Sequence, residues 1–129
     1  MRRLSKENKG SATVEFALAV ALLMAPLLLG LVDFGRYLHV KQIVSRAAHE
    51  GVLVATRDTD PGTVVRNAIA AAGLDSGKAS LALAPAIGTA ATGDQVRLTV
   101  SYDLNNYALV SWGDMFPQGV SVKAVARHE

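Results

Sequence analysis

The most hydrophobic part of the chain is a run at residues 16–32, which contains 17 residues and no charged side chain. As an α-helix it covers about 25 Å, slightly less than the roughly 30 Å hydrocarbon core of a bilayer. Starting the helix at Ser11 gives a comfortable span, but Glu15 then lies inside it. The pattern therefore predicts a transmembrane helix at residues 11–32 with a carboxylate near its start.

Helical periodicity continues beyond this run, with apolar residues at steps of three and four and polar residues largely opposite. We expect one helix over about residues 12–57, kinked at Pro26, where proline removes a backbone hydrogen bond. We interpret the side chains of its second half that recur on one face as core packing; they include Phe34, Tyr37, Leu38 and Val44. The alternative is that part of this stripe contacts neighbouring subunits.

A short second helix is expected after a break in the pattern. Asp60 is placed to cap it, Pro61 suits its first turn, and Gly73 suits its end. The helix itself is expected over residues 63–72.

Three strands are expected after that helix. They lie at residues 78–83, 95–104 and 120–126, and the middle one is strongest because hydrophobic and polar residues alternate along it. Between the last two strands, Trp112 and Phe116 are apolar enough to cover the end of a sheet. Residues 33–129 are thus expected to form an α+β domain, with a long helix, a short helix and a small antiparallel sheet.

Composition excludes several classes of function. The net charge is only +2 and basic residues form no patch with aromatic ones, so we expect no nucleic-acid partner. The chain has no cysteine, which rules out disulfides, thiolate metal sites and a cysteine nucleophile. His39, His49 and His128 lack the spacing of a metal site, and no nucleophile motif frames a serine. We therefore expect no enzyme, no metal and no cofactor.

Charge is concentrated before the hydrophobic run. Residues 1–10 carry Arg2, Arg3, Lys6 and Lys9 against a single acid, Glu7. Because positive flanks stay in the cytoplasm, we expect the N-terminus inside and residues 33–129 on the far side of the membrane.

Three interpretations of the hydrophobic segment compete. A cleaved secretory signal needs small residues at the end of its apolar run, whereas bulky residues stand there in this chain. An uncleaved signal anchor satisfies hydropathy but leaves Glu15 unexplained. If the chain were instead cut after Gly10, the new ammonium of Ser11 would lie four residues before Glu15. An amine and a carboxylate at that spacing can pair within one chain or between neighbours, which compensates an otherwise costly acid.

Beyond the hydrophobic run, Asp33 and Arg36 stand three residues apart in the expected helix. Residues at this spacing are neighbours on the helix surface. We expect them to form an ion pair at the outer membrane interface.

The order of basic leader, Gly10, Ser11, Glu15, Phe16 and apolar helix resembles the prepilin peptidase site of the type IV pilin superfamily. Two later segments narrow the match. They are Asp33-Phe34-Gly35-Arg36 and Ala47-Ala48-His49-Glu50-Gly51, which together resemble TadE/TadG-like pseudopilins of tight-adherence (Flp) pilus systems. His49 stands where that family usually has arginine, and Val52-Leu53 replaces its usual continuation.

The resemblance implies a type IV pilin-like fold and a minor pilin or pseudopilin that is cut between Gly10 and Ser11. It also implies a domain in the periplasm, an anchor in the inner membrane and, after assembly, a place in an extracellular pilus. The implied partners are prepilin peptidase, other pseudopilins, the major Flp pilin, an assembly platform and membrane lipid. The alternative is an uncleaved membrane-anchored domain that binds a ligand or envelope component in the periplasm.

Overall fold

The computed structural model describes residues 4–128 apart from 106, 108, 110–112 and 116, and it describes only the backbone of residues 4–9 and 114. Arg2 and Arg3 of the leader therefore lie outside the described residues. So do Trp112 and Phe116, for which we expected a position over the end of the sheet.

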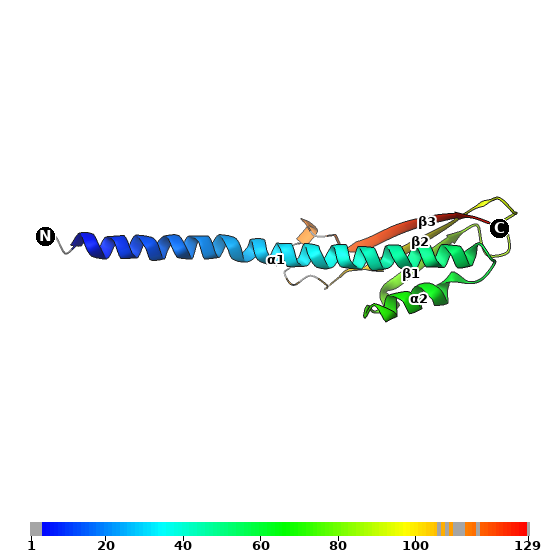
Figure 1. Ribbon diagram of the computed structural model, residues 1–129, viewed down its shortest axis with the longest axis horizontal. Helices are drawn as coiled ribbons and strands as arrows, with labels where there is room; N and C mark the ends of the chain where they lie inside the picture. The colour runs from blue at the N-terminus through cyan, green and yellow to red at the C-terminus, as the bar shows by residue number, and fades with distance from the viewer. Residues whose placement is uncertain (1–3, 106, 108, 110–112, 116, 129) are drawn as a thin grey trace.

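One α-helix, α1 (Leu4–Ala55), makes up the first 52 described residues. It begins before the expected residue 12, because residues 5–9 contain neither glycine nor proline and nothing in them stops a helix. It ends two residues before the expected position 57. Asp58 then adopts a left-handed φ of 55°, which turns the chain away from the helix axis. Figure 1 shows α1 extending far beyond the rest of the molecule at its N-terminal end.

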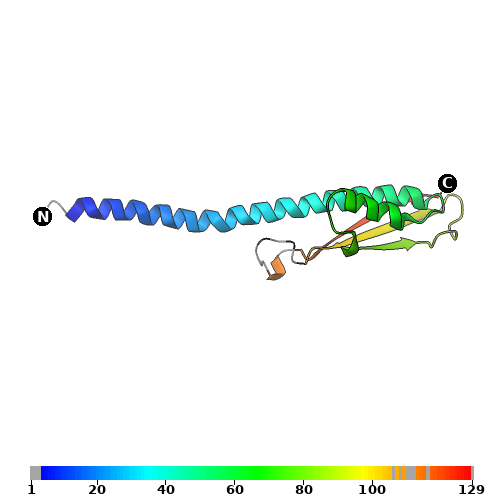
Figure 2. The same cartoon turned by 90° about the horizontal axis from the view of Figure 1, so that it is seen from below.

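The helix continues through Pro26 without a break. Proline cannot donate a hydrogen bond to the carbonyl four residues earlier, so a bend is expected where it occurs. Figure 2 shows α1 as an uninterrupted helix that is bent in its blue N-terminal half.

The second helix, α2 (Pro61–Ala71), begins as expected. The Asp60 carboxylate accepts a hydrogen bond from the Gly62 N–H at 3.0 Å, and Pro61 occupies the first turn. At the other end Gly73 takes a φ of 83°, while the Leu74 N–H donates back to the Ile69 carbonyl. This is the glycine-terminated helix end that the sequence indicated.

The sheet is an antiparallel meander of β1 (Ala79–Ala84), β2 (Gln95–Asp103) and β3 (Gly119–Arg127), in that order. A single-turn 3₁₀ helix, η1 (Ser76–Lys78), precedes β1, and another, η2 (Gly113–Met115), lies between β2 and β3. All three strands agree with the predicted ones to within one residue at each end. The expected α+β fold is confirmed.

The hydrophobic core lies between the sheet, the second half of α1 and α2. Alternate residues of the central strand β2 face it, and all of them are at least 97 % buried: Val96, Leu98, Val100 and Tyr102. From α1 the same core receives Val40, Val44, Ala47, Ala48, Val52 and Ala55. Figures 1 and 2 together show this half of α1 and α2 lying side by side over the same face of the sheet.

Gly51 lies where α1, α2 and β2 meet. A Cβ atom placed on Gly51 would lie 2.6 Å from Val65 Cγ2 and 2.7 Å from Leu98 Cδ2, both of which belong to fully buried side chains. Because real Cβ atoms do not approach other carbons this closely, only glycine lets the three elements pack at this distance.

The expected core stripe of α1 was right for Val44 but wrong for two of its members. Phe34 is 56 % exposed and Leu38 is 41 % exposed, while Tyr37 is half-buried. The reason is the helical step. The face that carries buried Asp33 and half-buried Tyr37 continues to Val40 and Val44. Phe34 and Leu38 each follow a member of this face by one residue, so they point about 100° away from it.

Candidate membrane and assembly site

The N-terminal half of α1 exposes apolar side chains on all sides. We call the exposed apolar residues of positions 14–32 the anchor surface; the large ones are Val14, Phe16, Leu18, Val20, Leu22, Leu23, Met24, Leu27, Leu28, Leu29, Leu31 and Val32. Among the residues described, α1 is the one helix long and apolar enough to cross a membrane, and its most apolar window is entirely unburied. A helix that is hydrophobic all round is stable only in lipid or against other apolar surfaces.

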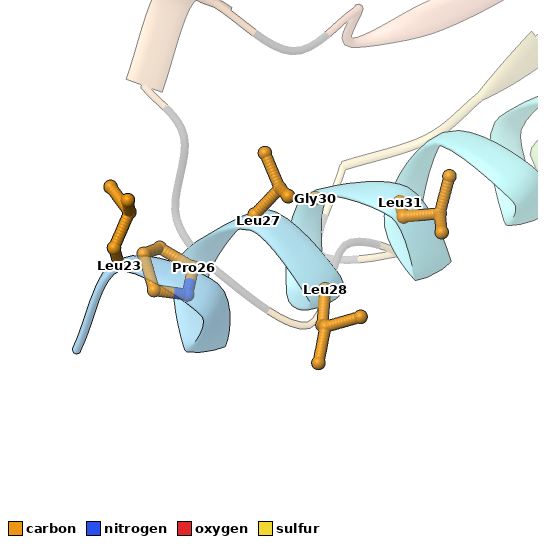
Figure 3. Close-up of a pocket in the computed structure, with 6 residues that line it drawn as sticks. All are labelled: Leu23, Pro26, Leu27, Leu28, Gly30 and Leu31. Atoms are coloured by element: carbon orange, nitrogen blue, oxygen red, sulfur yellow. The ribbon is translucent and has the colours of Figure 1, made fainter. Parts of the chain in front are cut away.

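Around Pro26 the anchor surface forms a hollow with an apolar lining. Figure 3 shows the six residues that line it, which are Leu23, Pro26, Leu27, Leu28, Gly30 and Leu31. The leucines project in different directions from the helix, and none of the six has a polar side chain. The hollow therefore suits an acyl chain or an apolar side chain of another helix.

The expected cut site lies on this exposed helix. Gly10 and Ser11 are both exposed, and a Cβ on Gly10 would have no atom within 4 Å. Glu15 is exposed one turn after Ser11, and Phe16 beside it is 72 % exposed. Among the described residues, none forms an ion pair with Glu15. Within the described part of the chain, no other segment covers Gly10 and Ser11, and no cation pairs with the acid.

Asp33 directly follows the anchor surface and is fully buried. Its Oδ1 accepts a hydrogen bond from the backbone N–H of Leu109, 76 residues later, at 2.8 Å. The ion pairs among the described residues join Arg46 to Glu50 and His128 to Asp58, so the expected pair with Arg36 is not among them. Asp33 instead holds the loop between β2 and β3 against the helix, and Arg36 is exposed to the surroundings.

The neighbours of Asp33 in the first motif face outward. Phe34 and Tyr37 have their rings stacked, with centroids 6.4 Å apart. Gly35 is exposed, and a Cβ there would have no atom within 4 Å. The need for glycine at position 35 therefore does not come from packing within the described part of the chain.

The second motif has a structural role. Ala47, Ala48 and Gly51 are buried under the sheet and α2, and Glu50 accepts a 3.0 Å hydrogen bond from Arg46 one turn earlier. This motif thus builds the core of the domain, while the positions from Gly10 to Phe16 lie on the exposed helix.

A contact at the opposite end of the molecule was not expected from the sequence. Asp58 Oδ1 accepts a hydrogen bond from the Gly88 N–H at 3.2 Å and lies 3.1 Å from His128 Nε2. It ties the end of α1 to the β1–β2 loop and to the end of β3. The sequence carries no signal for it, because the three residues are at least 30 positions apart. No group of three or more metal-binding side chains occurs among the described residues.

These features define the class of the molecule: a small α+β domain carried on one helix that is long and apolar enough to span a membrane. Comparison with protein families matches residues 10–53 to the model of TadE-like proteins, which confirms the resemblance seen in the sequence. The match comprises 44 of the 129 residues and covers the anchor surface and nearly all of α1 beyond it. No curated protein and no solved structure matches the chain.

Proposed function

We propose that the chain is a minor pilin or pseudopilin of a tight-adherence pilus, cut after Gly10 and assembled through its N-terminal helix. The observation that carries the proposal is the exposed Glu15 on an apolar helix, inside a range that matches the TadE-like family and begins at Gly10. Its role is that of a building block, not a catalyst.

The proposed path begins in the inner membrane. The basic leader keeps the N-terminus in the cytoplasm, residues 11–32 span the bilayer, and the domain faces the periplasm. Prepilin peptidase then hydrolyses the Gly10–Ser11 peptide bond. The leader leaves with a new carboxylate at Gly10, and Ser11 retains a new ammonium group.

Cleavage changes the electrostatics of the helix start. Before it, Glu15 lies in the interior of α1, far from either helix end. After it, Glu15 is in the second turn, where free backbone N–H groups and the ammonium of Ser11 favour a negative charge. A carboxylate at the centre of an apolar span costs on the order of 2.5–3.5 kcal/mol on insertion scales, and less near the start of the helix. Pairing with an amine of its own or a neighbouring chain offsets this cost and so stabilises assembly.

The partners follow from this path. They are prepilin peptidase, other pseudopilins, the major pilin of the fibre and an inner-membrane assembly platform. After assembly, the apolar helix would be covered by neighbouring helices and the α+β domain would remain on the outside. The subunit would then leave the inner membrane for an extracellular pilus.

The test compares Glu15→Ala with Glu50→Ala in the native host. Glu50 is the control because it is an acidic residue of the same helix, but its neighbours belong to the domain and not to the anchor surface. Both variants should be cut after Gly10. Glu15→Ala should be missing from isolated pilus complexes, whereas Glu50→Ala should be present at the level of the unmodified chain.

Assembly of Glu15→Ala at the unmodified level would overturn the proposed role of the carboxylate. A chain that keeps residues 1–10 and never enters a complex would favour the alternative, an uncleaved membrane-anchored binding domain.

A further inference from the structure

The loop between β2 and β3 lies at the end of the domain that meets the anchor. Figures 1 and 2 both show the described 3₁₀ helix of this loop, η2, in orange beyond the ends of the strands, on the side of the N-terminal half of α1. The 2.8 Å hydrogen bond from the Leu109 N–H to Asp33 places Leu109 beside Asp33, which is the first residue after the anchor surface. Leu109 therefore lies at the level where the apolar run of α1 ends.

Two described side chains of this loop are both apolar and exposed. Leu109 is 53 % exposed and Met115 is 88 % exposed, the largest value for any hydrophobic side chain described. On α1, Phe34 directly follows Asp33 and is 56 % exposed. Because the Leu109 N–H binds Asp33, Leu109 and Phe34 both lie next to the outer end of the anchor surface.

Helix length indicates what covers these side chains. Residues 11–32 cover about 33 Å as an α-helix, enough to cross the roughly 30 Å hydrocarbon core, so the outer boundary falls near Val32. Asp33 then lies at this boundary, where burial and a hydrogen bond shield its side chain from lipid.

We propose that the β2–β3 loop is a second membrane contact, in which Leu109 and Met115 enter the outer face of the bilayer beside the anchor. Exposed apolar side chains gain free energy by entering the interface, and Arg36 is exposed about one turn above Asp33, at the level of lipid phosphates. The contact fixes the tilt of the domain on the membrane while the subunit awaits assembly. It rests on the proposed topology but not on cleavage or assembly.

The absence of cysteine makes the test direct, because a single introduced cysteine can carry an environment-sensitive fluorophore. The full chain is reconstituted in phosphatidylethanolamine and phosphatidylglycerol vesicles that contain lipids spin-labelled near the headgroup. The variants are Met115→Cys, Leu31→Cys in the outer part of the anchor, and Ile87→Cys. Ile87 is the matched control, since it is 43 % exposed and lies in the β1–β2 loop at the far end of the sheet.

The labels at positions 115 and 31 should lose most of their fluorescence to the spin-labelled lipids, and the label at 87 should lose little. Quenching at 31 without quenching at 115 overturns the loop contact and leaves the anchor intact. A label at 115 with apolar emission but no quenching also overturns it, because a protein neighbour then covers the loop. Loss of quenching at 31 as well contradicts the transmembrane anchor itself. Far-UV circular dichroism of each labelled chain verifies that the fold is retained.

Discussion

Gly51 of α1 faces Val65 of α2 so closely that a Cβ on the glycine would lie 2.6 Å from the valine Cγ2. The contact joins the two helices at the same point where Leu98 of β2 enters the core. The close packing of α1, α2 and β2 therefore depends on the absence of a side chain at residue 51.

Gly51→Ala should destabilise the domain by about 1–3 kcal/mol, because the added methyl group overpacks a core that cannot yield without moving buried side chains. Thermal unfolding of the full chain in detergent, followed by circular dichroism, measures the effect. Gly35→Ala is the control in the same helix. A Cβ there meets no atom within 4 Å, so the midpoint should stay or rise, by up to about 1 kcal/mol of helix propensity. Equal midpoints for the two variants would contradict the packing role of Gly51.

Asp33→Ala should release the β2–β3 loop. The variant removes the acceptor of the Leu109 N–H, and an intramolecular hydrogen bond contributes about 0.5–1.5 kcal/mol. Hydrogen exchange at the Leu109 amide should accelerate, while exchange in β2 stays slow. Asp33→Asn keeps an oxygen acceptor and should restore most of the protection. Unchanged exchange at Leu109 in Asp33→Ala would show that other contacts hold the loop.

Asp58→Ala should weaken the end of the domain farthest from the anchor. It removes the acceptor shared by Gly88 and His128 and places alanine at a φ of 55°, which costs roughly a further 1 kcal/mol. We expect a loss of about 1–3 kcal/mol in the free energy of unfolding. Asp58→Asn retains an oxygen and tolerates the left-handed backbone, so its loss should be smaller. A larger loss for asparagine than for alanine would contradict this account.

Burial raises the pKa of the Tyr102 phenol above its ordinary value of 10.0, although a hydrogen bond with the Asp75 backbone opposes the shift. The folded state then holds this proton more tightly than the unfolded state. Stability from this group is therefore complete below about pH 10 and falls as the pH rises through the folded pKa. The unfolding midpoint should fall less on alkalinisation in Tyr102→Phe than in the unmodified chain. Equal falls in both would mean that the phenol titrates alike in the two states.

Periodicity and end signals predicted the elements well. The alternation in β2 placed Val96, Leu98 and Val100 on the buried face, and the Asp60-Pro61 pair marked the start of α2. These signals are local, since they depend on residues a few positions apart. They predicted the ends of the strands and of the second helix to within two residues.

These local signals could not predict contacts between segments that are far apart in the sequence. Asp33 was expected to pair with Arg36 because helical spacing shows only neighbours on the same helix. Its partner, Leu109, lies 76 residues away and contributes a backbone group, which every residue type carries. The pairing of Asp58 with His128 was missed for the same reason.

The proposed chemistry of the site at Gly10, Ser11 and Glu15 comes entirely from the sequence. The structure adds that these residues are exposed on a continuous helix. Their processing and assembly remain predictions, since both depend on partner proteins.

The most direct measurement is the intact mass of the protein isolated from its native host, together with its N-terminal sequence. Our account predicts a chain that begins at Ser11 and lacks residues 1–10. Gly10→Ala should retain the leader while still inserting in the membrane, because it alters the cut site and leaves the anchor unchanged. An unmodified chain that still begins at Met1, in a host with active prepilin peptidase, would contradict the central claim.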